Sequence, residues 1–298
     1  MSHNHGTTRG KKLAFTIFLN LTITLAQVVG GLFSGSLSLL SDAAHNFSDV
    51  IALIISWIAD KLSKKSYSNN QTYGFKRAEV IAATINVVTI IIIATNILIE
   101  GVKRFSEPVE ITGMTVILLA GLSILVNGLS VLVIKKETEK SMNMKSAYLH
   151  LFSDMLTSIA VLVGGILMYF FNLYWIDGII SIIIAAYLIV TSFKLLKETL
   201  SVLMQFTPGH LDIDDIKNSL ESFEWVRDIH HVHVWQLTDD EIHFQAHISF
   251  TEDVILSVAN ERLDQLKRLL HDTYDIEHST LEPEFMVCDD KQLIVDER

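Results

Sequence analysis

The feature that most constrains the fold of this 298-residue chain is a series of long apolar runs confined to residues 13–205. A helix needs about 20 mostly apolar residues to cross about 30 Å of hydrocarbon. Six segments approach this requirement: 13–33, 38–60, 78–101, 112–134, 147–171 and 176–200. We therefore predict a polytopic α-helical membrane protein with six transmembrane helices, preceded by a short tail over residues 1–12.

The loop charges predict the orientation of these helices. Lysines and arginines gather at one end of the predicted helices: Arg9, Lys11, Lys12, Lys61, Lys64, Lys65, Lys76, Arg77, Lys135, Lys136, Lys140, Lys145, Lys194 and Lys197. The opposite loops hold only Lys103 and Arg104. Because cytoplasmic loops carry an excess of Lys and Arg, we expect a multi-pass protein of the cytoplasmic membrane with both termini in the cytoplasm.

Residues 206–298 have the composition of a soluble domain. They carry 7 Lys and Arg against 22 Asp and Glu, whereas residues 1–205 carry 16 against 12. This acidic balance argues against nucleic acid as a partner, since phosphate binding needs clustered basic residues. The lone Cys288 excludes an intrachain disulfide and a cluster of thiolates around zinc.

Periodicity predicts the elements of this second domain. Helical spacing covers 212–222 and 254–271, and alternating or apolar stretches predict strands over 229–237, 242–250 and 276–285. The order helix, strand, strand, helix, strand indicates a small cytoplasmic α+β domain of the ferredoxin-like kind.

The pattern His-x-Phe-Ser-Asp occurs twice within the predicted spans, beginning at His45 and at His150. In each copy the histidine and the aspartate, Asp49 or Asp154, are four residues apart and so share one helix face. Ionisable side chains at membrane depth are costly and usually functional. Two imidazoles and two carboxylates suit tetrahedral zinc, and also cobalt or cadmium. The alternative is that each pair makes hydrogen bonds between packed helices.

A four-ligand site favours transport over hydrolysis, because a catalytic zinc keeps one position open for water. Metal binding requires deprotonated carboxylate and neutral imidazole, so such a site can exchange metal for protons. The pattern H-E-x-x-H of membrane metalloenzymes is absent from the sequence, and we predict that the chain is not an enzyme. The remaining alternative is a membrane-anchored metal sensor or scaffold without net transport.

Four segments together carry a resemblance to a known family: SLLSDAAHNFSD (38–49), TYGFKRAE (72–79), HLFSD (150–154) and HVHVW (231–235). They resemble the cation diffusion facilitator family. The resemblance implies a homodimeric antiporter that exports zinc, with cobalt and cadmium as further candidates, in exchange for protons. It also implies a transmembrane domain over 13–205, a cytoplasmic metal-sensing and dimerisation domain over 206–298, and a transport site of His45, Asp49, His150 and Asp154.

The resemblance further implies regulatory zinc in the soluble domain, near His233, His247 and His278, with Glu284 as a candidate fourth ligand. A three-residue loop of Asp239, Asp240 and Glu241 would place His233 opposite His247. The family has an acid where Thr280 stands here. The alternative is a polar sheet face whose histidines are satisfied by hydrogen bonds.

Two acids and one loop complete the sequence-based expectations. Asp42 is expected to stabilise the N-terminus of its helix, with a role in orienting His45 as the alternative. Asp177 is expected to stabilise the start of the sixth helix. The loop over 61–76 contains no His, Asp or Glu, so we predict no metal site there.

Overall fold

The computed structural model describes residues 5–63, 68–107, 109–135, 142–238, 241–286 and 293–294. The side chains of 5–17, 19, 52–57, 59–61, 63, 105–106, 133–135 and 142–151 lie outside the description. The chain divides into two units. The first comprises Met1–Trp57 and Ile85–Leu196, and the second comprises Ile58–Thr84 and Lys197–Arg298.

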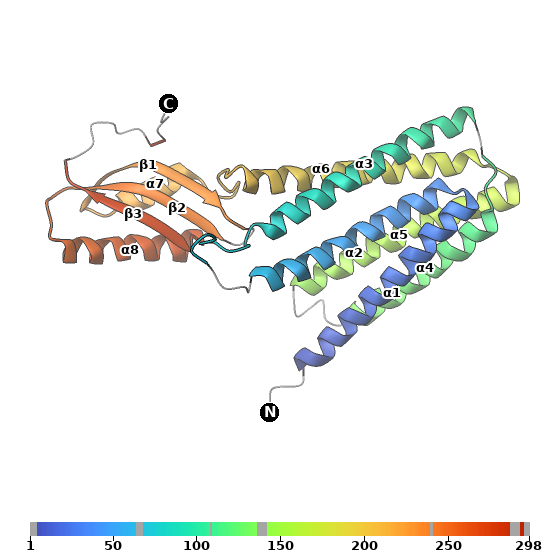
Figure 1. The fold of residues 1–298 in the computed structure, drawn as a ribbon, viewed down its shortest axis with the longest axis horizontal. Coiled ribbons are helices and arrows are strands. Elements are labelled where there is room, and N and C mark those ends of the chain that lie inside the picture. The colour runs from blue at the N-terminus through green and yellow to red at the C-terminus, as the bar shows by residue number, and fades with distance from the viewer. Residues whose placement is uncertain are drawn as a thin grey trace. The chain divides into compact units, whose positions relative to one another are not determined.

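Long helices occupy the same stretches of sequence as the six predicted spans, and Figure 1 shows them as extended coiled ribbons. They are α1 (His5–Ser34), α2 (Leu37–Ser63), α3 (Ala78–Ser106), α4 (Gly113–Lys135), α5 (Met142–Phe171) and α6 (Trp175–Leu203). In the described residues, the stretches long and apolar enough to cross a membrane are 78–104, 113–132, 152–171 and 175–203, and α1 holds a shorter apolar stretch over 20–34. The predicted polytopic α-helical membrane domain is confirmed. Helix α1 starts at His5, earlier than the predicted residue 13.

Glycines allow close approach between the helices of the first unit. A Cβ added to Gly165 of α5 would lie 3.0 Å from a side-chain carbon of Val116 and 3.2 Å from the backbone of Ile117, both on α4. A Cβ on Gly101 of α3 would lie 3.3 Å from the carbonyl oxygen of Gly178 on α6. Helices in a membrane associate by such close packing, because lipid supplies no hydrophobic drive between them.

Asp177 lies in the first turn of α6, but its carboxylate caps α2. It accepts hydrogen bonds from the backbone N–H groups of Leu37 (2.8 Å) and Ser38 (3.1 Å) and from the Ser38 hydroxyl (2.6 Å). Arg104 of α3 donates to the same carboxylate at 2.8 Å. Asp177 therefore lies at the start of α6, as expected, where an acid favours the helix N-terminus. The sequence did not indicate that this buried acid also fixes the start of α2.

The second unit contains the predicted α+β domain, which is confirmed. Its elements are α7 (Ile213–Glu221), β1 (Val226–Gln236), β2 (Ile242–Phe250), α8 (Leu256–Tyr274) and β3 (His278–Glu284). Strand β2 pairs with β1 antiparallel and with β3 parallel, so α8 forms the crossover and β3 is an edge strand (Figure 1). Asp212 caps α7 by accepting the N–H of Asp214 at 2.9 Å.

The hydrophobic core of this domain lies on one face of the sheet. Ile216 and Leu220 of α7 and Leu266 and Leu270 of α8 pack against the inward side chains of the strands, Ile248 among them. Because side chains alternate along a strand, the histidines between these apolar positions project from the other face. That face carries the histidines and glutamates that could hold a metal ion.

The predicted register of β1 and β2 is wrong. His233 pairs with Gln245, and His247 pairs with His230 beyond an irregularity between His230 and His233. Two features cause the difference. The connection closes at a hydrogen bond from Leu237 N–H to the Glu241 carbonyl, and an additional residue bulges from β1, where His231 has a φ of 54°.

Replacing Leu266 by Ala is expected to lower the free energy of unfolding of this domain by about 2–5 kcal/mol, because it leaves a cavity in the core. Leu256→Ala on the same helix is the control. Leu256 is 71% exposed, so its loss is expected to change stability by no more than about 0.5 kcal/mol. Hydrogen exchange of the β2 amides in the full chain measures both effects. Equal protection in the two variants would contradict the placement of Leu266 in the core.

Candidate functional site

Three of the four predicted intramembrane ligands converge in the first unit. His45 and Asp49 lie one turn apart on α2 and Asp154 lies on α5, and one ligand atom of each falls within 4.8 Å of the others. His45 Nε2 is 3.2 Å from Asp154 Oδ1, and Asp154 is fully buried. His150 also lies on α5, four residues before Asp154, but its side chain is outside the described ones. The repeated sequence pattern predicted that α2 and α5 would lie together, and the contact between His45 and Asp154 agrees with this.

Tyr187 of α6 lies beside this cluster. Its ring meets the ring of His45 edge to face, with centroids 6.1 Å apart and an angle of 81° between planes. No repeat or motif in the sequence marked Tyr187. Its position depends on the packing of α6, which places the tyrosine ring against the imidazole of His45.

A second buried polar group is centred on Asp42, three residues before His45 on α2. Gln27 of α1 donates to the Asp42 carboxylate at 2.6 Å and Ser158 of α5 donates at 3.0 Å. Asn46 donates in turn to the Gln27 side-chain oxygen at 3.1 Å. The expectation that Asp42 stabilises the helix N-terminus is wrong. It joins α1, α2 and α5 one turn from His45, and so holds the part of α2 that carries the predicted ligands.

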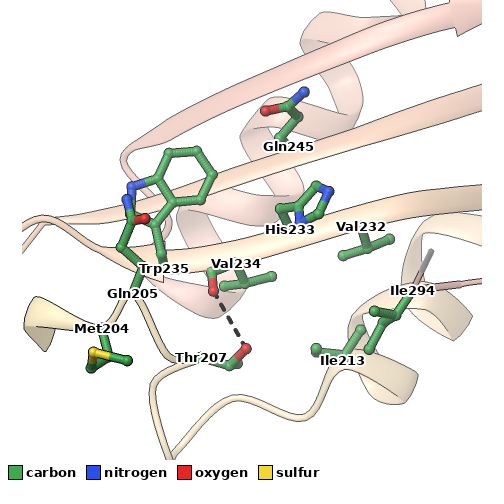
Figure 2. A pocket seen from close by; sticks show the side chains of 10 residues that line it. All are labelled: Met204, Gln205, Thr207, Ile213, Val232, His233, Val234, Trp235, Gln245 and Ile294. Carbon is green, nitrogen blue, oxygen red and sulfur yellow. Dashed lines mark hydrogen bonds between the residues drawn. The ribbon is translucent and has the colours of Figure 1, made fainter. Parts of the chain in front are cut away.

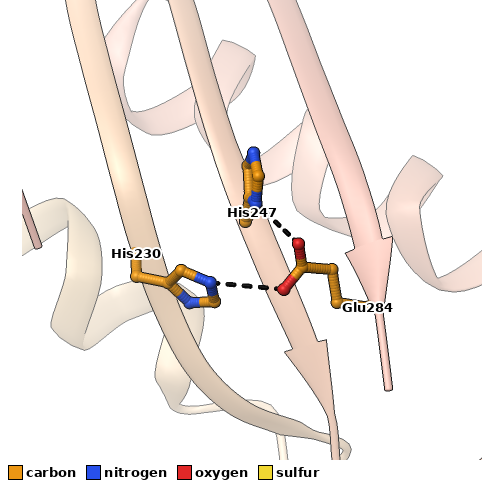
Figure 3. Close-up of side chains that lie close together, drawn as sticks. All are labelled: His230, His247 and Glu284. Carbon is orange, nitrogen blue, oxygen red and sulfur yellow. Dashed lines mark hydrogen bonds and ion pairs between the residues drawn. The ribbon is translucent and has the colours of Figure 1, made fainter. Parts of the chain in front are cut away.

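In the C-terminal domain, His230, His247 and Glu284 form a first histidine cluster (Figure 3). Glu284 Oε1 is 2.6 Å from His247 Nδ1, and its other oxygen is 3.2 Å from His230 Nε2. His230 is buried, with 1% of its side chain exposed. Two imidazoles and a carboxylate make a donor set that suits zinc.

A second histidine cluster consists of Glu241, His243 and His278. Glu241 Oε1 lies 3.3 Å from His243 Nε2 and 3.1 Å from His278 Nε2. The two imidazole rings are stacked with centroids 4.8 Å apart. Burial, with a contribution from the nearby His278, lowers the pKa of His243 below its usual value, although Glu241 acts in the opposite sense. His243 is therefore favoured in the neutral form that binds metal.

The predicted soluble-domain set of His233, His247 and His278 is not brought together. His247 belongs to the first cluster and His278 to the second. His233 is exposed and lines a separate pocket of about 530 Å³ with Gln245 (Figure 2). The hairpin closes between Leu237 and Glu241, which places His233 opposite Gln245, and the bulge in β1 then brings His230 opposite His247. No sequence signal marked that bulge. The suggestion of Glu284 as a ligand agrees with its position in the first cluster.

Comparison with known proteins gives a family match for each of two parts of the chain. Residues 13–204 match the family described as "Cation efflux transmembrane domain", and residues 208–284 match "Cation efflux protein, cytoplasmic domain". The "Cadmium, cobalt and zinc/H(+)-K(+) antiporter" of Bacillus velezensis is 35% identical over 286 residues, which cover 95% of this chain and 91% of that protein.

Two further relatives match over similar lengths. The "Metal cation efflux system protein CzcD" of Cupriavidus metallidurans is 32% identical over 290 residues, covering 97% of this chain and 90% of that protein. The "Zinc transporter ZitB" of Escherichia coli is 29% identical over 301 residues, covering 97% and 94%. The similarity therefore spans both units.

Glu284→Ala is expected to weaken zinc binding by the first cluster by about tenfold or more, since loss of even an outer-shell partner of a metal ligand costs about 10- to 100-fold. His233→Ala is the control, because His233 lies in another pocket. Equilibrium dialysis of the purified chain measures the zinc bound per chain. A loss of zinc in the His233 variant without a loss in the Glu284 variant would contradict the observed strand pairing. It would favour the predicted register, in which His233 lies opposite His247.

Proposed function

We propose that this chain, which belongs to the cation diffusion facilitator family of metal efflux transporters, exports zinc from the cytoplasm in exchange for protons. The transport site comprises His45, Asp49, His150 and Asp154. The observation that carries the proposal is the convergence of His45 and Asp49 of α2 with the buried Asp154 of α5 in the first unit.

The donor set supports zinc as the substrate. Imidazole nitrogen suits zinc, cobalt and copper, whereas magnesium and manganese favour carboxylate, carbonyl and water oxygens. The relatives' names include zinc, cadmium and cobalt, which agrees with a mixed nitrogen and oxygen site. A closed shell of four protein ligands holds the ion without leaving a position for hydrolytic water.

Proton exchange follows from the same ligands. The His45 imidazole and the Asp154 carboxylate, whose facing atoms are 3.2 Å apart, bind a metal only when deprotonated. Protons that enter from the outer side therefore displace the ion, and zinc that enters from the cytoplasm displaces protons. Alternating exposure of this site to the two sides of the membrane would couple the two gradients.

The orientation and the assembly belong to the same proposal. The excess of basic residues in alternate loops supports cytoplasmic termini in the cell membrane. The match of residues 208–284 to a family cytoplasmic domain supports the same side for the C-terminal domain. We take the assembly to be a homodimer, as the family resemblance implies, with zinc at the first histidine cluster acting as a regulator.

A membrane-anchored sensor without net transport is the second candidate, and the histidine clusters of the C-terminal domain favour it. Metal binding by that domain alone would satisfy this function. It leaves Asp49 of α2 and Asp154 of α5 without a role, however, although placing such groups in a membrane is costly. Measurement of net flux separates the two functions.

Asp154→Asn is expected to abolish zinc uptake into inverted vesicles driven by an imposed pH gradient. The substitution keeps the shape of the side chain and removes the charged ligand that faces His45. Glu100→Gln is the control, because Glu100 pairs with Lys103 at a half-exposed position outside the cluster.

Gradient-driven flux that is the same in the Asp154 variant and the wild type would overturn the proposed transport site. Saturable zinc binding with no net flux in the wild type would favour the sensor instead. Proton movement is followed in the same vesicles with a pH-sensitive dye.

His45→Asp is expected to widen the metal selectivity toward manganese, because it replaces a nitrogen ligand by oxygen and makes the site harder. Competing zinc and manganese fluxes in the same vesicles report the change as a ratio. A ratio identical to that of the wild type would show that His45 does not set the selectivity.

A further inference from the structure

The second histidine cluster lies against the segment that leads into α3. Lys76 Nζ is 2.7 Å from Glu241 Oε1 and 2.6 Å from Glu241 Oε2. The ring of Tyr73 meets His243 edge to face, with centroids 5.6 Å apart. All of these residues belong to the second unit, and the segment that carries Tyr73 and Lys76 continues into α3 at Ala78. One carboxylate therefore serves both the histidines and the lysine.

The cluster has the composition and access of a metal site. Its three donors are two imidazole nitrogens and a carboxylate oxygen whose ligand atoms lie within 4.8 Å of one another. They open onto a pocket of about 400 Å³, and 54% of the His278 side chain is exposed. Zinc takes four ligands in such sites, so three protein donors leave one position for water.

The surroundings preorganise the two buried donors. Trp235 stacks on His243 with centroids 5.2 Å apart and an angle of 16° between planes, which fixes the imidazole plane. Burial opposes ionisation of Glu241, but the hydrogen bonds and charge of Lys76, with help from the histidines, lower the pKa of this carboxyl overall. Glu241 is therefore held as a carboxylate, which is the form that binds a metal.

Lys76 and a divalent cation would compete for this carboxylate. The ammonium group contacts both oxygens of Glu241, including the one that faces the two histidines. A dication at that oxygen would repel the ammonium and replace its hydrogen bonds. The geometry therefore predicts that the Lys76 ammonium group and a metal ion exchange at Glu241.

We propose that Glu241, His243 and His278 form a binding site for a zinc-like divalent cation, and that the cation displaces Lys76 from Glu241. Binding would release the tie between this domain and the segment before α3. The metal site stands on its own geometry. Its use to adjust efflux to the cytoplasmic metal level rests on the transport function proposed above.

Zero-length carbodiimide crosslinking tests the exchange directly in the purified full chain. The reagent joins Lys76 to Glu241 by an amide bond when the two groups are in contact, and peptide mass spectrometry measures the yield. At free zinc about ten times the dissociation constant, roughly one site in eleven stays empty, so we expect the yield to fall about tenfold. The Lys217–Glu221 pair on α7, 3.5 Å apart, is the internal reference whose yield zinc should not change.

Two histidine variants separate this site from the others. His278→Ala removes a half-exposed ligand, so the same zinc concentration should no longer protect the Lys76–Glu241 pair from crosslinking. His271→Ala is the matched control, because His271 is an exposed histidine of α8 whose observed partner is Asp272. It should behave as the wild type. In addition, Lys76→Gln is expected to bind zinc several-fold more tightly, because the competing ammonium is gone.

A crosslink yield that zinc leaves unchanged in the wild type would overturn the proposal. So would equal protection by zinc in the wild type and the His278 variant, because the cause would then lie at another site. Crosslinking is measured without flux. Failure of transport with intact exchange would therefore reject the proposed function and keep the site, and the opposite result would reject the site alone.

Discussion

The structure depends on how a bundle of apolar helices accommodates buried carboxylates. Placing a charge in a low-dielectric interior is costly unless donors or counter-charges are supplied. Each of three fully buried acids in the membrane unit, Asp42, Asp154 and Asp177, meets this requirement through groups on other helices. These contacts tie α1, α2, α3, α5 and α6 together, and they also define where an ion can be held.

The three acids differ in the kind of partner that they meet. Asp177 accepts from backbone N–H groups and from the guanidinium group of Arg104. Asp42 accepts hydrogen bonds from two neutral side chains, Gln27 and Ser158. Asp154 faces His45 across 3.2 Å, and both side chains are predicted metal ligands. The first two contacts are suited to fixed structure, and the third is suited to the proposed metal site.

In the α+β domain, carboxylates also lie against imidazoles, as Asp154 lies against His45. Glu284 lies between His230 and His247, and Glu241 lies between His243 and His278, so each carboxylate has two imidazoles within reach. The two clusters are separate because β3 runs parallel to β2, which sets His278 beside His243 at one end and Glu284 near His247 at the other. Only the second cluster includes a lysine from the segment before α3.

The sequence by itself determined the helices of the membrane unit, the α+β order of the soluble domain and three of the side chains that meet in the intramembrane cluster. Period and repeat are local properties, and the shared face of His45 and Asp49 follows from one helical turn. Tertiary structure alone decided the partners of Asp42 and Asp177, because those contacts join residues from different helices. It also decided the histidine clusters. The point at which the hairpin closes and a bulge in β1 together changed which side chains oppose one another, and both depend on how the sheet pairs and twists.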